Sequence, residues 1–419
     1  IDGPQITLAE EALSRKRKAL GKLREVERIA DESNLNQLID NRNSRRGIIT
    51  MGLPYLSLMD VLEKASGKPD VLKLGFVHPI PRKIVEALVK SHEEVKILEE
   101  LDDVLEKEVK SLAYDAGLNA RILGKMDPED WIGEYTADKV QDVLNSTWPD
   151  MLEAKHPAAV LPEVVLARPP QMCPGCGHRS AFHAIKKALN GQDITVADIG
   201  CHTLGYLPPY EMGQIMMCMG ASPGIGSGLS LFNTSRKVIV FMGDSTFFHA
   251  GLPGILNTVF NRHPITLILM ENGTTAMTGH QEHAGVGENF NGPTDKVPVR
   301  QVLEGLGVKH IYEVDTYRQS RLTELVETAV NNPEFSVVIA KHPCMLKFTR
   351  EARRKPGYQV KQVHIDQKSC NQAHACVAYF GCPTFTRHTD GKVTVNPDLC
   401  IGDGSCLQTC PTRAIEKPR

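Results

Sequence analysis

Apolar runs of strand length alternate with segments of helical spacing along two long stretches of the chain. In the first stretch, from about 45 to 130, we expect helices at residues 56–65 and 81–90 and strands at residues 47–52, 71–76 and 94–99. In the second, from about 171 to 350, the expected strands are residues 194–198, 238–242, 265–270 and 336–340. Strands that alternate with helices indicate parallel sheets. The predicted fold class is therefore α/β, with two parallel-sheet domains.

The regions before and after these stretches have different patterns. Residues 8–30 are dense in Glu, Lys, Arg, Ala and Leu, which predicts a surface helix. From about residue 360 the apolar runs are short and cysteines are frequent, which is typical of a small domain held by metal. We expect four parts: a helical linker at 1–45, an α/β domain with a connector at 46–150, a second α/β domain at 151–355 and a small α+β domain at 360–419.

Composition excludes several functional classes. The chain has 419 residues, 41% of them hydrophobic, and a formal net charge of -2, so bulk charge gives no reason to expect nucleic-acid binding. No apolar run approaches the roughly 18 residues of a membrane span. The chain begins with Ile1 rather than Met and shows no secretory pattern, so we expect a cytoplasmic protein whose sequence begins partway into a longer polypeptide or after processing.

Eleven cysteines are the strongest feature of the composition, and they cluster from Cys173 onward. Without an export signal, disulfides explain them poorly, and metal binding or redox chemistry explains them better.

A candidate cofactor motif follows two successive strands. Gly243, Asp244 and Ser245 come directly after one apolar run, and Asn272 follows the next. The carboxyl ends of neighbouring parallel strands meet at one sheet edge, where open sheets bind ligands. A carboxylate, an amide oxygen and a backbone carbonyl near Thr274 suit Mg²⁺, which also binds diphosphate oxygens. The alternative is an Asp at a strand end and an Asn in a turn, with no ligand.

Two polar or glycine-rich segments surround this motif. Gly220, Ser222 and Gly224 belong to a glycine-rich turn that opens a helix, where backbone can approach a ligand closely or a helix can pack closely. The segment from Asn272 to Gln281 is polar and is expected to wrap the metal and the diphosphate.

Four cysteines in the second α/β stretch form a candidate cluster site: Cys173, Cys176, Cys201 and Cys344. Four thiolates can hold a four-iron cluster, and a structural zinc site or a redox pair are the alternatives. Cys218 stands in the apolar run Met216-Met-Cys-Met219 and is expected in the core.

The last sixty residues contain a repeated cysteine pattern. The first run is Cys370, Cys376 and Cys382 before Pro383, and the second is Cys400, Cys406 and Cys410 before Pro411. Bacterial ferredoxins use such runs with each final cysteine serving the other cluster. This frame gives one site with Cys370, Cys376 and Cys410 and a second with Cys382, Cys400, Cys406 and Asp403 as an oxygen ligand.

The middle cysteine of each run is replaced, by Ala373 and by Asp403. Three thiolates favour a three-iron cluster, or a four-iron cluster with a non-cysteine ligand. A domain that has lost one cluster is the alternative.

Several motifs together closely resemble the large subunit of the 2-oxoacid:ferredoxin oxidoreductase family, in its indolepyruvate-type branch. They are Cys173-Pro-Gly-Cys-Gly-His178, Asp198-Ile-Gly-Cys201, Gly243-Asp-Ser-Thr-Phe-Phe-His249 and Thr275-Ala-Met-Thr-Gly-His-Gln281, followed by the two cysteine runs. The resemblance covers nearly the whole chain. Residues 47–130 look like the family's transketolase C-terminal-type domain, and the C-terminal part looks like a bacterial ferredoxin. Ser245 stands where the diphosphate motif of thiamine enzymes normally has Gly.

The resemblance implies an enzyme that binds thiamine diphosphate, Mg²⁺ and iron–sulfur clusters of the [4Fe–4S] and [3Fe–4S] types. It would decarboxylate a 2-oxoacid, an aryl pyruvate such as indolepyruvate, to acyl-CoA and CO₂ with coenzyme A as co-substrate. Electrons would pass through the clusters to ferredoxin or a similar acceptor. A smaller subunit would complete a hetero-oligomer, with no nucleic-acid or membrane partner.

The resemblance also implies roles for single residues. His178, His202 and His280 are candidates for contacting substrate or cofactor, since His transfers protons near neutral pH; a structural role is the alternative for each. The family's pyrimidine domain, whose Glu activates the cofactor, has no counterpart in these residues. It would precede Ile1 or lie in another chain.

Two other functions compete with this hypothesis. A non-oxidative thiamine-dependent decarboxylase has no electrons to pass on, so the clusters argue against it. A non-catalytic electron-transfer subunit is favoured by the missing pyrimidine domain, and the Asp244 and Asn272 motif argues against it.

Overall fold

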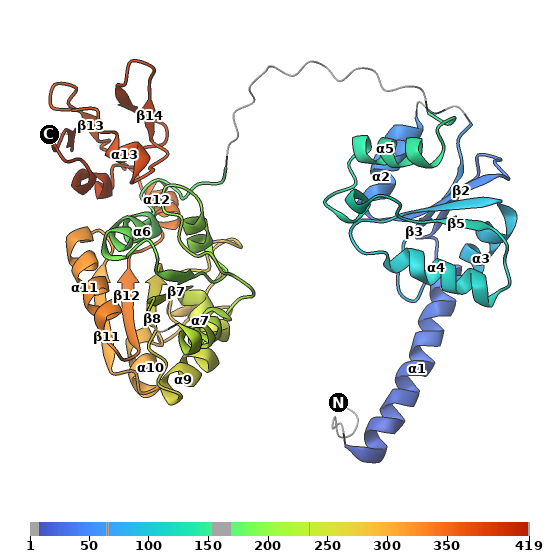
Figure 1. The fold of residues 1–419 in the computed structure, drawn as a ribbon, viewed down its shortest axis with the longest axis horizontal. Helices are drawn as coiled ribbons and strands as arrows, with labels where there is room; N and C mark the ends of the chain where they lie inside the picture. The colour runs from blue at the N-terminus through green and yellow to red at the C-terminus, as the bar shows by residue number, and fades with distance from the viewer. Residues whose placement is uncertain (1–7, 64, 66, 153–168, 234, 418–419) are drawn as a thin grey trace. The chain divides into compact units, whose positions relative to one another are not determined.

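The computed structural model describes residues 8–63, 65, 67–152, 169–233 and 235–417. The chain divides into two compact units, residues 1–165 and 166–419 (Figure 1). No helix in the described part of the chain combines the length and the apolar character that a membrane span requires.

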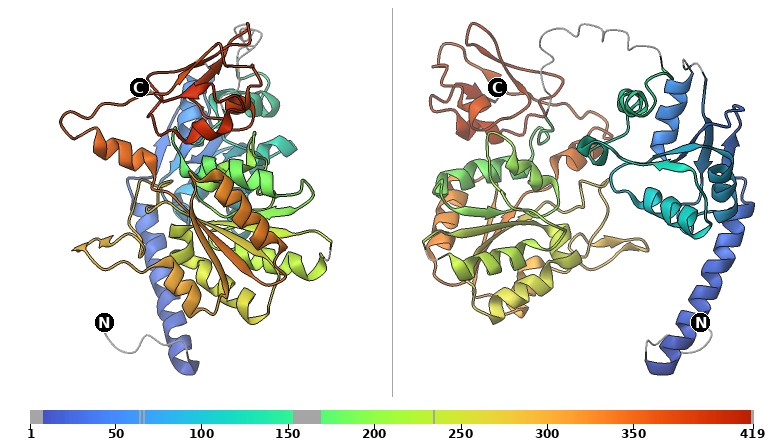
Figure 2. Two further views of the ribbon diagram at one scale, coloured as in Figure 1. Left: turned by 90° about the vertical axis from the view of Figure 1, so that its left-hand side faces the viewer. Right: turned by 45° about the vertical axis from the view of Figure 1, so that its right-hand side comes forward.

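The first unit is a five-stranded sheet with helices on both faces (Figures 1 and 2). The strand order is β1-β3-β2-β4-β5, with β1 antiparallel and the others parallel. The strands are β1 (Gln37–Ile39), β2 (Arg46–Met51), β3 (Asp70–Leu74), β4 (Glu94–Leu98) and β5 (Arg121–Leu123). The helices are α1 (Ala9–Glu32), α2 (Leu53–Leu62), α3 (Arg82–Ser91), α4 (Val104–Asp115) and α5 (Ala137–Thr147), and a short 3-10 helix, η1, spans Pro128–Trp131.

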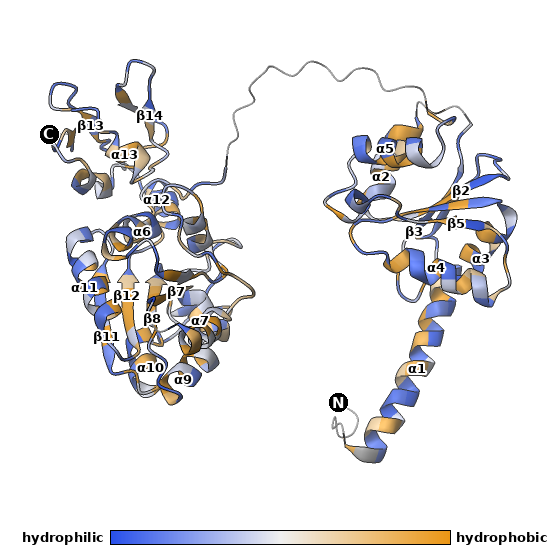
Figure 3. Cartoon of the chain, viewed as in Figure 1, coloured by the Kyte–Doolittle hydropathy of each residue, from blue (hydrophilic) through white to orange (hydrophobic). Residues whose placement is uncertain are grey.

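Alternation along the strands explains the two apolar layers of this unit. In β2, Ile49 packs with α3 and α4 on one face, whereas Ile48 packs with α2 and α5 on the other. Successive strand residues point to opposite faces, so a strand buried on both sides reads as one apolar run. Figure 3 shows β2 and β3 in the colours of apolar residues, whereas α1 alternates polar and apolar positions.

Several elements of this unit were not predicted. β1 lies inside the expected linker and pairs Leu38 with Leu72, and its three residues are too few to form an apolar run. Two parallel-sheet domains were expected, and this antiparallel edge strand makes the first sheet mixed. α5 was expected to be connector, but Val140, Val143 and Leu144 bury its apolar side against α2.

Lys96 is a charged side chain buried inside the first unit. It lies on β4, is 1% exposed, and its Nζ donates to the carbonyl oxygen of Gly124 at 2.5 Å. Burial lowers the pKa of Lys96 to about 8, and the nearby carboxylates of Asp130 and Glu106 offset this only in part. Charging this amine therefore costs folding free energy at neutral pH.

We expect Lys96→Met to stabilise the first unit by about 1–3 kcal/mol at pH 7, because a thioether of similar length needs no hydration. An unfolded lysine ionises near pH 10.4, so between pH 8 and that value the unfolded state binds more protons. Stability of the parent protein therefore rises with pH across this window, and the variant loses that rise.

Urea unfolding followed by tryptophan fluorescence measures this effect, since both tryptophans of the chain, Trp131 and Trp148, lie in the first unit. Lys107→Met is the matched control, because the Lys107 side chain is 73% exposed and its ion pair with Asp103 is solvated. A destabilised Lys96→Met protein would show instead that the bond to Gly124 outweighs the cost of burial.

The second unit contains a fully parallel sheet with strand order β11-β12-β8-β7-β6. The strands are β6 (Ile194–Val196), β7 (Val238–Gly243), β8 (Thr266–Glu271), β11 (His310–Asp315) and β12 (Ser336–Lys341). The helices around it are α6 (Gly177–Ala188), η2 (Cys201–Tyr206), α7 (Ser222–Phe232), α8 (Asp244–Thr246), η3 (Phe247–Gly251), α9 (Leu252–Phe260), α10 (Val299–Gly305), α11 (Gln319–Asn331) and α12 (Met345–Ala352). A small hairpin, β9 (Glu288–Asn289) and β10 (Gly292–Pro293), projects from it.

Helices cover both faces of this sheet as well. α6 and α11 pack on the face that carries Phe241, and α7, α9 and α10 pack on the face that carries Val240. The four strands expected from apolar runs are present within one or two residues at each end. β11 was not predicted, because this edge strand mixes polar and apolar residues and only one of its six residues is buried.

The C-terminal domain, from β13 to β16, lies beyond the carboxyl ends of the sheet strands (Figures 1 and 2). It consists of two short antiparallel pairs and single turns of helix: β13 (His364–Ile365), α13 (Ala375–Ala378), β14 (Phe385–Arg387), β15 (Val393–Val395), η4 (Ser405–Thr409) and β16 (Ile415–Glu416). Its apolar cluster is small and contains Cys382, Cys400 and Cys406 themselves. Thiol groups therefore form part of the core of this domain.

Candidate active site

Asp244 joins the ends of two neighbouring strands. It follows β7, is 2% exposed, and its Oδ2 accepts the backbone N–H groups of Asn272 at 2.9 Å and Gly273 at 2.7 Å, just after β8. Its Oδ1 accepts the N–H of Ser245 at 2.9 Å. A carboxylate has about four acceptor positions, so one remains for a further partner.

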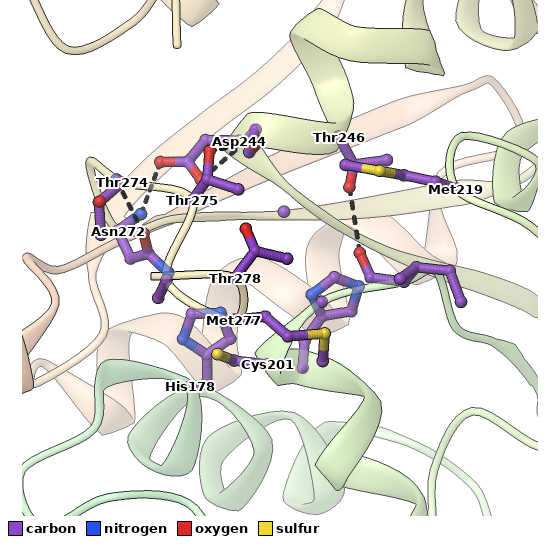
Figure 4. Close-up of a pocket in the computed structure, with 16 residues that line it drawn as sticks. His178, Cys201, Met219, Asp244, Thr246, Asn272, Thr274, Thr275, Met277 and Thr278 are labelled. Carbon is purple, nitrogen blue, oxygen red and sulfur yellow. Dashed lines mark hydrogen bonds between the residues drawn. The ribbon is translucent and has the colours of Figure 1, made fainter. Parts of the chain in front are cut away.

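Asn272 and Thr274 lie beside Asp244 in one cavity, called here the aspartate pocket. The amide oxygen of Asn272 accepts the N–H of Thr274 at 3.0 Å, which fixes the turn. Figure 4 shows Asp244, Asn272 and Thr274 on one side of the pocket and His178 and Cys201 on another. The pocket is lined by His178, Ile199, Gly200, Cys201, His202, Met219, Gly243, Asp244, Ser245, Thr246, Asn272, Thr274, Thr275, Ala276, Met277 and Thr278. Hard oxygen donors suited to Mg²⁺ are therefore present in this cavity.

Two buried histidines line the same pocket. The rings of His178 and His202 are stacked with centroids 6.2 Å apart. Burial lowers the pKa of His178 to about 4 and that of His202 to about 3, so both rings are neutral near pH 7. The Nε2 atom of His202 is buried without a hydrogen-bond partner among the described residues. Such an unpaired atom suits contact with a polar ligand.

Asp198, at the end of the β6 segment, positions the glycine-rich turn. Its carboxylate accepts the backbone N–H groups of Gly220 at 2.8 Å and Ser222 at 3.1 Å. Gly220 has a φ of +90°, and a Cβ there would lie 2.5 Å from Ala250, so the turn requires glycine. Gly220, Ser222 and Gly224 do not line the aspartate pocket, whereas their neighbour Met219 does.

Cys173, Cys176, Cys201 and Cys344 line a second cavity, called here the cysteine pocket, although they come from distant parts of the chain. Cys173 and Cys176 precede α6, Cys201 begins η2 after β6, and Cys344 caps α12 after β12. Burial raises the pKa of all four thiols, that of Cys201 to about 11. Within the described ranges, no three His, Cys, Asp or Glu side chains form a group that could hold a single metal ion.

The aspartate pocket and the cysteine pocket share one wall. His178, Cys201, Asn272 and Ala276 line both cavities. A group bound at Asp244 and a cluster held by the cysteines would therefore be immediate neighbours.

The repeat predicts two sets of cysteines in the C-terminal domain, and this division stays a prediction. Burial raises the pKa of Cys376 to about 11, with further contributions from Cys370 and Cys410. Burial also raises the pKa of Cys406, with contributions from Asp403, Cys382 and Cys400.

Three expectations differ from the observed positions. His280 and Gln281 line neither pocket; the backbone folds back between Thr275 and Gln281, and the N–H of His280 donates to the carbonyl oxygen of Thr275 at 3.0 Å. Burial and the nearby charges of Arg350 and Lys347 lower the pKa of His280. Cys218 is exposed, so the prediction that it lies in the core was wrong. The Met-rich run around it forms a loop rather than a strand.

Two further side chains were not singled out in advance. His283 Nε2 lies 3.4 Å from Asp244 Oδ2, and no periodic pattern marks the loop that carries it. Thr275 donates from its hydroxyl to that of Ser245 at 2.7 Å, which links the two polar turns.

Residues 198–340 match the family described as thiamine pyrophosphate enzyme, C-terminal TPP binding domain. Residues 393–416 match the 4Fe-4S binding domain, which includes the second cysteine run. The indolepyruvate oxidoreductase subunit IorA of Methanothermobacter marburgensis is 35% identical over 413 residues, which cover 96% of this chain and 64% of that protein. The chain is a homologue of IorA.

Other IorA subunits are similar to this chain to the same extent. That of Archaeoglobus fulgidus is 34% identical over 95% of this chain and 63% of its own length, and that of Thermococcus kodakarensis is 33% identical over 94% and 64%. The chain thus spans a little under two thirds of the IorA relatives. The predicted similarity to indolepyruvate oxidoreductase subunits is confirmed, as are the thiamine-diphosphate-binding and iron–sulfur domains.

Proposed function

We propose that this chain carries the thiamine-diphosphate and iron–sulfur centres of an enzyme that oxidatively decarboxylates a 2-oxoacid. The observation that carries the proposal is the wall shared by the aspartate pocket and the cysteine pocket. A non-oxidative decarboxylase has no use for an electron acceptor next to its cofactor. A pure electron-transfer subunit has no use for a buried carboxylate at paired strand ends.

In this proposal Asp244, Asn272 and the carbonyl of Thr274 hold Mg²⁺ with the diphosphate. Thiamine diphosphate, when bound, supplies the nucleophilic carbon and the electron sink for loss of carbon dioxide. Ser245 and Thr275 fix the turns around the diphosphate through their mutual hydrogen bond. The turn that starts at Gly220 holds Met219 against the cofactor.

His178 and His202 have a different task. Because both rings are neutral near pH 7, each has one N–H to donate and one nitrogen that can accept a proton. We infer that the unpaired Nε2 of His202 meets the cofactor or the 2-oxoacid, since a buried polar atom normally has a partner. His280 lines neither pocket, although its Nδ1 is also buried without a partner among the described residues.

Cys173, Cys176, Cys201 and Cys344 would hold a four-iron cluster that takes electrons one at a time. The two C-terminal sites would carry them outward to ferredoxin or a similar acceptor, and coenzyme A would accept the acyl group. The names of the IorA relatives suggest indolepyruvate or another aryl pyruvate as substrate and a smaller partner subunit in a hetero-oligomer. The first unit would be the transketolase C-terminal-type domain of such an enzyme.

Anaerobically purified full-length polypeptide, with its smaller subunit, should contain iron and acid-labile sulfide. Indolepyruvate and coenzyme A should produce a reduced-cluster EPR signal only when thiamine diphosphate and Mg²⁺ are present. Reduction of the clusters with 2-oxoglutarate but not with indolepyruvate would show that the substrate is not an aryl pyruvate. Iron without any 2-oxoacid-dependent reduction would favour the electron-transfer subunit, and decarboxylation without iron would contradict the proposal.

A further inference from the structure

Arg179 is a buried cation at the junction of α6 and the C-terminal domain. It is 2% exposed, and its guanidinium donates to the carbonyl oxygens of Met172, Phe380 and Gly381 and to the hydroxyl of Tyr210. These bonds tie the segment before Cys173 to the segment before Cys382. Arg179 therefore fixes two cysteine-bearing segments to one helix.

The neighbours of Arg179 do not neutralise its charge. Among the residues that the structure describes, no carboxylate forms an ion pair with it, and its Nε–H is buried without an acceptor. Carbonyl groups supply dipoles but no net charge. An unpaired buried guanidinium costs several kcal/mol, so an anionic partner is expected close to it.

Hydrogen bonds place Arg179 next to three cysteines. Its guanidinium donates to the carbonyl oxygens of Met172 and Gly381, which directly precede Cys173 and Cys382, and its backbone N–H donates to the carbonyl oxygen of Cys176 at 3.1 Å. Cys173 and Cys176 belong to the cysteine pocket, whereas Cys382 belongs to the second C-terminal site. One cation is thus within electrostatic reach of two separate cysteine sites.

The loop between Cys173 and Cys176 also touches the second C-terminal site directly. A Cβ on Gly175 would lie 3.2 Å from the Asp403 carboxylate and 2.4 Å from Ile401 Cδ1. The carbonyl of Gly175 accepts the hydroxyl of Tyr317 at 2.7 Å. The Cys382, Cys400 and Cys406 site is therefore the one next to the cysteine pocket.

We propose that Arg179 is the shared counter-charge of these two iron–sulfur sites and that it raises the reduction potentials of both. The inference rests on the proposed function only in taking the cysteines as cluster ligands. Thiolate-held clusters are anionic, and each gains one more negative charge when it accepts an electron. A fixed cation beside both clusters favours the reduced form of each. When one electron passes from the first cluster to the second, the first is oxidised and the second is reduced, and the same cation would balance the charge before and after the transfer.

The test is a dithionite-mediated redox titration of the anaerobic full-length protein, followed by EPR, which needs no substrate. In Arg179→Gln we expect both midpoint potentials to become more negative, with the reduced-to-oxidised ratio at a fixed potential falling at least about tenfold, or about 59 mV for one electron. Arg179→Lys keeps the charge, so its potentials should stay close to those of the parent. Lys187→Gln removes an exposed charge from the same helix and should change neither potential.

Tyr210→Phe separates charge from domain docking. It removes the 2.7 Å bond to the carbonyl of Phe380 without removing a charge, so its potentials should not change. Equal shifts in Tyr210→Phe and Arg179→Gln, or a shift at only one site, would overturn the shared counter-charge. If Arg179→Gln does not fold, negative shifts in Arg179→Lys would overturn it instead. Parent protein without iron and sulfide would reject the cluster assignment itself, which is a different failure.

Discussion

Asp244→Asn should lower 2-oxoacid-dependent dye reduction by about 10³-fold while the clusters remain reducible by dithionite. The buried carboxylate is the only formal negative charge that the described part of the chain contributes to the lining of the aspartate pocket. Its amide replacement cannot neutralise a cation, and its NH₂ group would face the N–H donors of Asn272 or Ser245. Losing an oriented charge at a reacting centre typically costs 10²–10³-fold, and loss of the cofactor's anchor adds to that.

Calorimetric titration with thiamine diphosphate and Mg²⁺ measures the binding part of this effect and should show little or no heat for Asp244→Asn. Ser245→Gly is the matched control, because it changes the next residue but keeps the carboxylate. It loses only the hydroxyl bond from Thr275, so activity should stay within about tenfold of the parent. Activity of Asp244→Asn within tenfold of the parent would remove Asp244 from the cofactor site.

Cys201→Ser should abolish electron transfer from the 2-oxoacid while leaving thiamine diphosphate binding intact. Of the four cysteines, Cys201 is the one that lines both pockets, so it would be the proposed cluster ligand nearest to the cofactor. A serine hydroxyl is a poor ligand for iron beside a thiolate, and we expect dye reduction to fall by about 10³-fold or more, since no other acceptor adjoins the cofactor. Iron analysis should show the loss of one cluster's worth of iron per chain.

Cys218→Ser is the control for thiol chemistry in general. Cys218 is exposed and lies in neither pocket, so this variant should keep its iron content and its activity. Unchanged iron in Cys201→Ser would show that the cysteine pocket does not hold a cluster. Loss of iron in Cys218→Ser would assign this cysteine a role that the fold does not suggest.

Elements buried on both faces could be predicted from the sequence because burial leaves a continuous apolar run. β7 and β8 are examples, and the polar residues directly after them, Asp244 and Asn272, mark the sheet edge as a site. β1, β5 and β11 could not be predicted in this way, since short edge strands keep polar residues and have few apolar neighbours. Their positions follow from tertiary pairing.

The site was predicted to a similar extent. Cys173, Cys176, Cys201 and Cys344 were grouped because four thiolates suffice for a cluster, and all four line the cysteine pocket. His283 was not identified, since a loop without periodicity gives no indication of where its side chains point. The role predicted for His280 stays a prediction, because a motif segment fixes residue identity but not the turn that carries it.

The origins of the four cysteines around the cysteine pocket have a consequence for maturation. Cys173 and Cys344 stand on either side of the complete parallel sheet in the chain, and only the finished sheet brings their segments together. If the cysteine pocket holds a cluster as proposed, iron insertion there would have to wait until the ribosome has released β12 and the strands have paired. The six cysteines after residue 369 form their own local group, so scaffold proteins that deliver iron can fill them independently. The two kinds of site should therefore be loaded in separate steps. A substitution that makes folding of the sheet temperature-sensitive should delay loading of the cysteine pocket alone.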